Sequence, residues 1–493
     1  MHSSNASPLE AAIKTATETV TLTILHTNDM HGRVAALSRI VTLARQIRQE
    51  VTSQGSACVL WDAGDAEDTI LLESSLTRGA AVMSLLAAAG YELQALGNAS
   101  ILRYGPRILP EHRARFGRPL LCANLVERSS GNLPAGLTPY TIVPCGDVRI
   151  GVIGLSAPIP VYTVFDLEPR QPQDVLPDLI AQVRAAGAQT IVLLSHLGSK
   201  ADQQLAETIP GLDLIIGAHD HVALDPPLLV NSTLIAQAGD HGRFLGRLDL
   251  ALDRHSGRIV SHTGRLLPIS DALPPDPDFE QAWLAVQAEV KAQAARPVGE
   301  LLAPLELVDD RECSAGNLLA DALLARLPDV ELALALAGQW THGLPAGPVS
   351  YGGLNSAMRL STNPGRVMLS GDEIHRWLAS AVQPANAARK LHALRDRACG
   401  LPHVAGAQVF YDPAQPDSLT VTVGGEPLAP DRQVAVATTD LEFSEMIGYV
   451  VIDEARVAFE VPTIMAEMLE DYLALHWPLT PPTGPRMMAQ ATA

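Results

Sequence analysis

The stretch Thr23–Arg33, TILHTNDMHGR, decides the fold, because a strand-like run ends there at a turn that carries metal-ligating side chains. Residues 19–24 alternate Thr with Val, Leu or Ile, which is the period of a β-strand. Asp29 and His31 follow, two residues apart, and could bind one metal ion through an oxygen and a nitrogen. Asp and His are also common in turns, so this pair alone favours an ordinary turn over a metal site.

Composition limits the class of protein. The chain has 493 residues, 47% of them hydrophobic and 18% charged, which predicts two or three globular domains. Its net charge of −19 argues against binding a nucleic-acid polymer, whose phosphates need clustered Lys and Arg. A small phosphorylated partner is still compatible, because a bound divalent metal reverses the local field.

The chain shows no targeting or membrane signal. Residues 1–20 lack a basic region and an apolar region, and no run of about 18 apolar residues occurs. We therefore expect no membrane partner and a cytoplasmic location for the chain as given, or a periplasmic or secreted one if a leader was removed. The five cysteines are odd in number and widely spread, which favours buried thiols over disulfides.

A repeated pattern organises residues 19–270: an apolar strand, a polar loop with Asp, Asn or His, and often a helix. This predicts an α/β domain with its ligands at the strand ends. The expected helices are 35–50, 80–89 and 173–186; the expected strands are 57–61, 93–96, 119–124, 190–194 and 212–216, with hairpins over 139–155 and around 255–257.

The composition of the sequence changes near residue 271. The Pro- and Asp-rich segment 271–277 and a helical stretch after it predict a linker and connecting helix over 271–297. A second α/β domain is expected over 298–477, with a helix at 315–327 and strands at 330–336, 367–369 and 434–438. Residues 478–493 are expected to form a flexible tail.

Seven oxygen or nitrogen donors stand at predicted strand ends of the first domain. They are Asp29, His31, Asp65, Asn98, His196, His219 and His221. Any one of these histidines could be an ordinary core or surface residue, but the seven donors together follow one predicted strand after another. Two divalent metals about 3.5–4 Å apart need such a set, with one carboxylate shared. The donor types suit Mn, Zn, Fe or Co better than Ca.

The order and the sequences of these segments resemble those of the 5'-nucleotidase family of the calcineurin-like metallophosphoesterase superfamily, over roughly residues 19–475. The matching stretches are LHTNDMHG (25–32), DAGD (62–65), LGN (96–98), CANL (122–125), SHLG (195–198), IIGAHDH (215–221), SAGNLLADAL (314–323), LSGDEIHRWL (369–378) and VATTD (436–440). The resemblance implies an N-terminal metallophosphoesterase α/β sandwich and a C-terminal 5'-nucleotidase-type α/β domain that closes over the cleft.

The resemblance also implies the roles of the donors. Asp29, His31 and His221 would hold the first metal ion; Asn98, His196 and His219 would hold the second; and Asp65 would bridge them. The two ions would activate a hydroxide for in-line attack on phosphorus, so that no protein nucleophile is needed.

The sequence departs from the family at two places. The family follows the Asn with His-Glu-Phe-Asp, whereas Asn98 is followed here by Ala99-Ser100-Ile101-Leu102, so the family's catalytic His and its Asp are absent. Loss of a positioned acid typically costs about 10²–10⁴ in rate. Nearby Arg103 either stabilises a phosphoryl oxygen or is a solvated loop cation.

The second departure concerns substrate recognition. The Gly-rich segments with which the family binds nucleotides are replaced around residues 337–343 and 444–449. Trp340, Phe443 and Tyr449 are the remaining substrate-binding candidates, with core packing as the alternative for Trp340 and Phe443.

These observations predict a metal-dependent phosphoesterase acting on a small phosphomonoester or cyclic phosphodiester. Its rate would be slow, or its substrate would differ from the usual nucleotides. The alternative is a non-catalytic, metal-holding binding or regulatory relative. A sulfur ester as substrate is also compatible with the same site.

Overall fold

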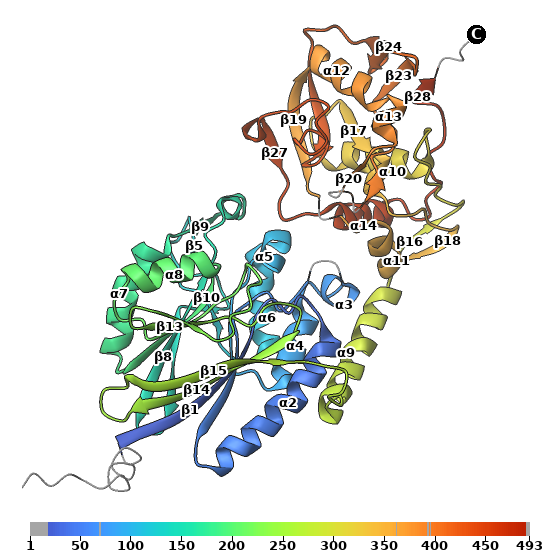
Figure 1. Ribbon diagram of the computed structural model, residues 1–493. Coiled ribbons are helices and arrows are strands. Elements are labelled where there is room, and N and C mark those ends of the chain that lie inside the picture. Colours follow the sequence, from blue (N-terminus) through green and yellow to red (C-terminus); the bar gives the residue numbers. More distant parts are fainter. Residues whose placement is uncertain (1–17, 69–70, 361, 392–393, 395, 490–493) are drawn as a thin grey trace, which may run out of the picture. The chain divides into compact units, whose positions relative to one another are not determined.

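The computed structural model describes residues 18–489 except 69–70, 361, 392–393 and 395. The chain divides into two compact units, residues 1–290 and 291–493, with the division inside helix α9 (Pro277–Ala295). Figure 1 shows both units as mixtures of helices and strands. Among the described residues, no helix has the length and apolar character needed to cross a bilayer.

The first unit contains two large sheets. The order in the first sheet is β15 (Ile259–Pro268), β14 (Phe244–Asp253), β1 (Thr19–Thr27), β2 (Ala57–Asp62), β3 (Leu93–Ala95), β4 (Leu120–Leu121) and β6 (Leu137–Thr138). The order in the second is β12 (Leu228–Val230), β13 (Thr233–Ala236), β11 (Leu214–Ile216), β10 (Thr190–His196), β8 (Val148–Ser156) and β7 (Tyr140–Cys145). Strands β5 (Leu125–Glu127) and β9 (Leu167–Pro169) form a separate pair.

The two sheets pack face to face. Leu22, Ile24 and Trp61 of the first sheet share one buried cluster with Val192 and Leu214 of the second. Successive residues of β10 and β8 alternate between this cluster and a second one, which lies under the helices. Strands buried on both faces need continuous apolar runs, and this explains sequences such as IVLL and LII.

Helices cover both outer faces of this sandwich. Helices α7 (Pro172–Ala185) and α8 (Ser199–Thr208) contribute Leu176, Ile180 and Leu205 to the cluster against the second sheet. Figure 1 shows α2 (Val34–Ser53) and α4 (Ala80–Ala89) on the opposite side of the unit. Shorter helices are α3 (Leu72–Ser75), α5 (Ala99–Tyr104) and α6 (Leu109–Phe116), with 3-10 turns at Pro106–Ile108 and Pro160–Phe165.

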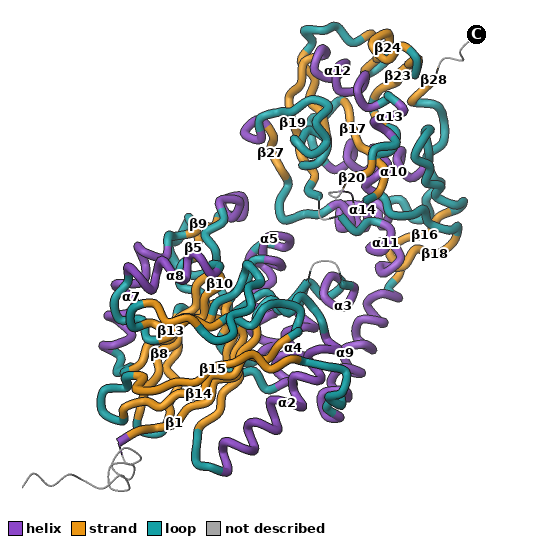
Figure 2. Tube along the Cα trace, in the orientation of Figure 1, coloured by secondary structure: helices purple, strands orange, loops and turns teal. Residues whose placement is uncertain are grey.

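The second unit is a mixed α/β body whose strands stand out in Figure 2. Its main sheet has the order β22 (Pro402–Ala405), β17 (Leu332–Leu336), β26 (Gln433–Thr439), β19 (Pro364–Ser370) and β27 (Val457–Phe459). A second sheet contains β25 (Glu426–Pro427), β24 (Gln415–Val423), β23 (Ala407–Asp412) and β28 (Met487–Ala489). Two-stranded pairs are β16 (Pro297–Leu301) with β18 (Gly347–Ser350) and β20 (Lys390–Leu391) with β21 (Arg397–Ala398). The helices are α10 (Ser314–Arg326), α11 (Tyr351–Ala357), α12 (Gly371–Ala381), α13 (Pro384–Ala387) and α14 (Met465–Leu475).

One segment of the predicted flexible tail has regular structure. Residues 487–489 form β28, which pairs in parallel with β23. Met487 is buried in the core of the second unit, and the guanidinium of Arg486 binds both carboxylate oxygens of Asp321 at 2.7 and 2.9 Å. These contacts order a segment whose Pro- and Thr-rich composition predicted fraying. Residues 490–493 of the predicted tail lie outside the described residues.

Candidate metal centre

The predicted donors follow strands that run parallel within each sheet. Strands β1, β2 and β3 are parallel in the first sheet, and β10, β11 and β13 are parallel in the second. Parallel strands have their carboxyl ends at one edge, so the loops after them meet there. Asp29 and His31 follow β1, whereas His219 and His221 follow β11.

The backbone at the donors is unusual. Five of the seven have positive φ: Asp29 (49°), His31 (45°), Asp65 (52°), His219 (82°) and His221 (60°). Residues other than glycine rarely adopt this conformation, which costs of order 1–3 kcal/mol each, and such residues cluster at functional sites. The turns therefore aim these side chains at the expense of backbone stability.

Asp29, His31 and His221 form a compact triangle. His31 Nε2 lies 3.2 Å from His221 Nε2, and Asp29 Oδ1 lies 3.8 Å from the former and 3.6 Å from the latter. A point in their plane and equidistant from the three atoms is about 2.1 Å from each, which is the usual distance from Zn to a nitrogen or oxygen ligand. The three atoms thus already have the spacing of ligands around one ion.

A second group contains Asp29, Asp65 and His196, whose ligand atoms lie within 4.8 Å of one another. His196 Nε2 is 3.2 Å from Asp65 Oδ2 and 4.0 Å from Asp29 Oδ1. The ring of His219 lies next to that of His196, with centroids 5.1 Å apart. Asp29 is common to both groups, whereas Asp65, to which the resemblance assigns the bridge, belongs to the second.

Several buried polar atoms of the site lack a hydrogen-bond partner among the described residues. They are Asp29 Oδ1, His196 Nε2 and Asn98 Oδ1. Asp29 and His196 are fully buried, and a buried polar group without a partner costs about 1–3 kcal/mol or more. A cation between Asp29 Oδ1 and His196 Nε2, which lie 4.0 Å apart, would satisfy both atoms, and oxygen and imidazole nitrogen are suitable ligands for a divalent transition metal. The residues present therefore fit a metal ion.

The remaining atoms of these donors are held in place by the protein. His196 Nδ1 donates to the Ala63 carbonyl at 3.0 Å, which fixes the ring with Nε2 toward the centre. Asp29 Oδ2 accepts hydrogen bonds from the His219 N–H at 2.9 Å and from Asn28 Nδ2 at 2.7 Å. Asp29 and His196 thus each have one atom engaged by the fold and another turned toward the centre.

The electrostatics of Asp65 and His196 describe a charged pair. Burial opposes ionisation of Asp65, but the adjacent imidazole of His196 outweighs it and lowers the pKa of the carboxyl. Burial likewise disfavours a charged His196, and the carboxylates of Asp65 and Asp29 raise its pKa. Two buried carboxylates at one point create a field that favours a cation.

The loop that carries Asn98 rests directly on Asp65. A Cβ at Gly97 would lie 2.0 Å from Asp65 Oδ1, and the Ala99 N–H donates to the same oxygen at 2.9 Å. Arg103, on α5, is only 6% exposed, and its guanidinium carbon lies 5.1 Å from the ring centroid of Tyr104. Burial contradicts the description of Arg103 as a solvated loop cation.

The predicted substrate residues of the second unit differ in exposure. Trp340 is fully buried after β17 and offers no face to a ligand, which corrects its assignment as a stacking residue. Phe443 lines a cavity of about 390 Å³ together with Phe459 and other residues. Tyr449 does not line this cavity; it packs edge-on against Trp377, with ring centroids 5.7 Å apart.

The sequence reasoning missed Asp240 and His241, which follow β13. Asp240 Oδ2 lies 3.4 Å from His221 Nδ1 and 3.1 Å from His241 Nδ1. The available signal was the segment Gly239-Asp240-His241-Gly242, which repeats the pattern of an apolar strand followed by polar turn residues.

Known proteins resemble this chain along most of its length. Residues 294–454 match the family described as 5'-nucleotidase, C-terminal domain. An uncharacterized metallophosphoesterase of Bacillus subtilis, YunD, is 26% identical over 461 residues, which cover 92% of this chain and 99% of that protein. The snake venom 5'-nucleotidase of Gloydius brevicauda is 26% identical over 408 residues, which cover 73% of this chain and 66% of the venom protein.

The fold is also that of a solved structure. The 5'-nucleotidase precursor from Thermus thermophilus superposes with a TM-score of 0.53 at 22% identity, covering 96% of this chain and all of that one. Residues 294–454 thus match the C-terminal domain of 5'-nucleotidases, and the chain as a whole is similar to 5'-nucleotidases and metallophosphoesterases in sequence and in fold.

Proposed function

We propose that the protein is a metal-dependent hydrolase of small phosphate esters, either phosphomonoesters or cyclic phosphodiesters. The observation that carries this proposal is the triangle of Asp29 Oδ1, His31 Nε2 and His221 Nε2, whose sides of 3.2–3.8 Å match ligands around one ion. The family implies divalent metal ions, and relatives named 5'-nucleotidase act on nucleotides.

We assign two ions to the site. Asp29, His31 and His221 hold the first; Asn98, His196 and His219 hold the second; and Asp65 is shared. Mn, Zn, Fe or Co suits this mixture of oxygen and nitrogen donors. When bound, such ions polarise a phosphoryl oxygen and lower the pKa of a bound water.

The surrounding residues keep the donors ready for that chemistry. The Ala63 carbonyl accepts a hydrogen bond from His196 Nδ1, and this contact turns Nε2 toward the centre. Asp240 faces the Nδ1 of His221. Such outer contacts raise the basicity of metal-binding imidazoles and fix their rings. Asp29 keeps one oxygen for the centre, because its other oxygen is occupied by the His219 N–H and by Asn28.

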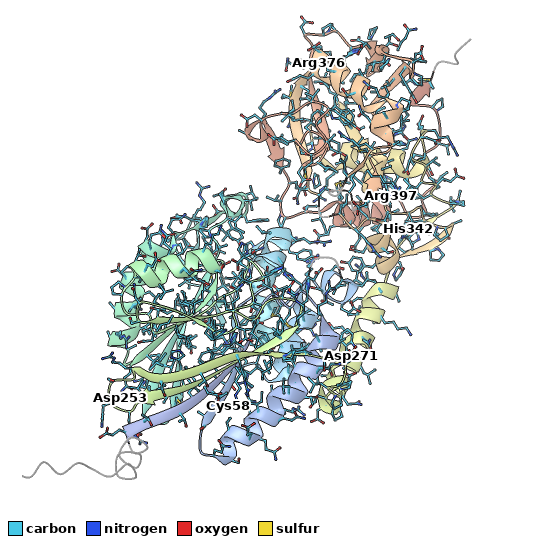
Figure 3. The ribbon with its side chains drawn as sticks, in the orientation of Figure 1. Cys58, Asp253, Asp271, His342, Arg376 and Arg397 are labelled. Carbon is cyan, nitrogen blue, oxygen red and sulfur yellow. The ribbon has the colours of Figure 1, made fainter. Side chains whose placement is uncertain are left out.

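Turnover should be measured with p-nitrophenyl phosphate, bis(p-nitrophenyl) phosphate and a panel of nucleotides, with and without added Mn²⁺. Asp65→Asn keeps the size of a buried donor but removes its charge, and should reduce turnover by at least about 10²-fold. Asp271→Asn is the matched control, because Asp271 is an exposed carboxylate paired with Arg39 at the surface (Figure 3).

The absence of an imidazole at position 99 favours a second candidate, a non-catalytic metal-binding relative. Ala99→His restores an imidazole at the start of α5, so turnover should rise in this variant if the protein is an enzyme limited by that loss. Metal binding without hydrolysis of any of these esters, in wild type and Ala99→His alike, would refute the hydrolase and leave the binding protein.

A further inference from the structure

The first turn of helix α8 contacts both of the segments that carry His196, His219 and His221. His196 ends β10, shortly before this helix, whereas His219 and His221 follow β11. Ser199 and Asp202 lie three residues apart in the first turn, so they are neighbours on one face of the helix. Each of these two residues contacts one of the two segments.

Asp202 holds the strand that ends at His196. Its Oδ1 accepts a hydrogen bond from the hydroxyl of Ser195, the residue before His196. Asp202 and Ser195 are fully buried, and a Cβ at Gly217 would lie 2.4 Å from Asp202 Oδ2. Gly217 directly follows β11, so the same carboxyl group also packs against the start of the loop after that strand.

Asp220 lies between His219 and His221 and binds two separate elements. Its Oδ2 accepts hydrogen bonds from the Ser199 N–H at 2.8 Å and from the Ser199 hydroxyl at 2.5 Å. Its Oδ1 accepts one from Nε2 of Gln237, a buried residue just after β13, at 2.8 Å. Three hydrogen bonds thus fix one carboxylate between the start of a helix and the end of a strand.

Helix α8 depends on this carboxylate at its first turn. The N-cap residue is Gly198, which has no side chain and therefore makes no side-chain cap. The first N–H groups of a helix lack partners within the helix, and a helix N-terminus favours a negative charge. Asp220 supplies both the acceptor and the charge, so the helix and the loop after β11 fix each other.

We propose that Asp220 is a positioning residue that sets the spacing of His219 and His221, with the first turn of α8 as its support. This role rests on the proposed function, because it assumes that His221 binds the first ion and His219 the second. Both histidines have positive φ, and such a backbone persists only where surrounding contacts enforce it. Loss of contacts that orient metal ligands typically lowers metal affinity by about 10–100-fold.

Three substitutions separate the hydrogen bonds of Asp220 from its charge. Asp220→Ala removes the acceptor of Ser199 and Gln237. Asp220→Asn removes the charge but keeps one oxygen for Ser199, and its amide can donate to Gln237 Oε1, which has no hydrogen-bond partner among the described residues, once that amide rotates. Ser199→Ala removes the hydroxyl and leaves the N–H in place. Asp178→Ala is the matched control, because Asp178 is exposed on α7, which covers the same sheet.

The measurements are calorimetric titration with Mn²⁺, the EPR spectrum of the Mn²⁺-loaded protein and thermal unfolding of the metal-free protein. We expect Asp220→Ala to bind Mn²⁺ at least about tenfold more weakly and to lose the magnetic coupling of two ions about 3.5–4 Å apart. Asp220→Asn should bind within about threefold of wild type, because only the interaction of its charge with the helix is lost. Ser199→Ala should lie between these two variants, and Asp178→Ala should equal wild type.

Metal-free Asp220→Ala should remain folded, because Asp220 is exposed and lies outside the hydrophobic core. If its unfolding temperature nevertheless falls sharply, Ser199→Ala decides the question. A weaker affinity for Mn²⁺ in Ser199→Ala supports the positioning role, and an unchanged affinity overturns it.

Unchanged Mn²⁺ affinity in Asp220→Ala would overturn the inference. Equal losses in Asp220→Ala and Asp220→Asn would also overturn it, because the charge of Asp220 and not its hydrogen bonds would then act on the ions. If wild type hydrolyses no ester but Asp220→Ala weakens Mn²⁺ binding and Asp220→Asn does not, the proposed function fails and the positioning role stands. If wild type hydrolyses esters and Asp220→Ala binds Mn²⁺ as tightly, the proposed function stands and the positioning role fails.

Discussion

Gly97→Ala should disturb the metal centre although it replaces none of the metal-binding side chains. The new Cβ would lie 2.0 Å from Asp65 Oδ1 and 2.3 Å from the Asp65 backbone nitrogen. Ordinary contacts begin near 3.4 Å, so the Asp65 and Asn98 loops must separate by roughly 1 Å. Gly97 does not have a positive φ, so the expected effect is steric and not a matter of backbone conformation.

The expected magnitude follows from that displacement. Overpacking of this kind costs about 1–3 kcal/mol of stability. A displacement of about 1 Å at a catalytic group lowers turnover by about 10²-fold. Because Asp65 and Asn98 are assigned to the metals, the affinity for Mn²⁺ should fall by at least about tenfold.

Calorimetric Mn²⁺ titration, thermal unfolding and turnover of p-nitrophenyl phosphate measure these three effects. Gly353→Ala is the control, because Gly353 lies in helix α11 and a Cβ there meets only the Ser350 hydroxyl oxygen at 3.1 Å. If Gly97→Ala binds Mn²⁺ within about twofold of wild type and unfolds at the same temperature, Gly97 does not set the position of Asp65.

Three further predictions follow from the contacts described. Asp240→Asn removes the carboxylate that faces Nδ1 of both His221 and His241, so the affinity for Mn²⁺ should fall by about 10–100-fold; an unchanged dissociation constant would exclude this orienting role. Removal of divalent metal with a chelator should abolish turnover and lower the unfolding temperature of the first unit. A metal ion present at 100 times its dissociation constant stabilises the folded protein by about 2.7 kcal/mol. Scanning calorimetry before and after metal is restored checks this prediction. Burial lowers the pKa of His403 to about 4, while Nε2 accepts from the Cys313 N–H and Nδ1 donates to the Leu401 carbonyl. The unfolded chain protonates this histidine below its usual pKa of about 6.5, so its pH-dependent contribution, about 3 kcal/mol, is present above pH 6.5 and is lost as the pH falls toward 4; denaturant unfolding of His403→Gln should show a smaller loss over that range, and equal slopes for both proteins would refute the assignment.

Local sequence determined the elements that position the site. Alternating residues predict β1 and apolar runs predict β10 and β11, because strands buried on one or both faces have these periods. The hairpin predicted over residues 139–155 is confirmed by β7, which ends at Cys145, and β8, which begins at Val148. Once the strands are placed, their carboxyl ends bring Asp29, Asp65 and His196 to one edge.

Only the tertiary structure decided which other side chains surround that edge. Asp240 and His241 follow a strand of four residues, and their positions depend on contacts with His221 in the loop after β11 and with Asp29 in the loop after β1. Trp340 precedes Thr341 and His342 and Arg103 is a charged residue, yet both side chains are buried by packing. Likewise, β28 is held in place because Arg486 pairs with Asp321 and Met487 packs in the core. Local periodicity reports which face of an element is apolar, whereas these outcomes depend on contacts between separate elements of the fold, which no local pattern encodes.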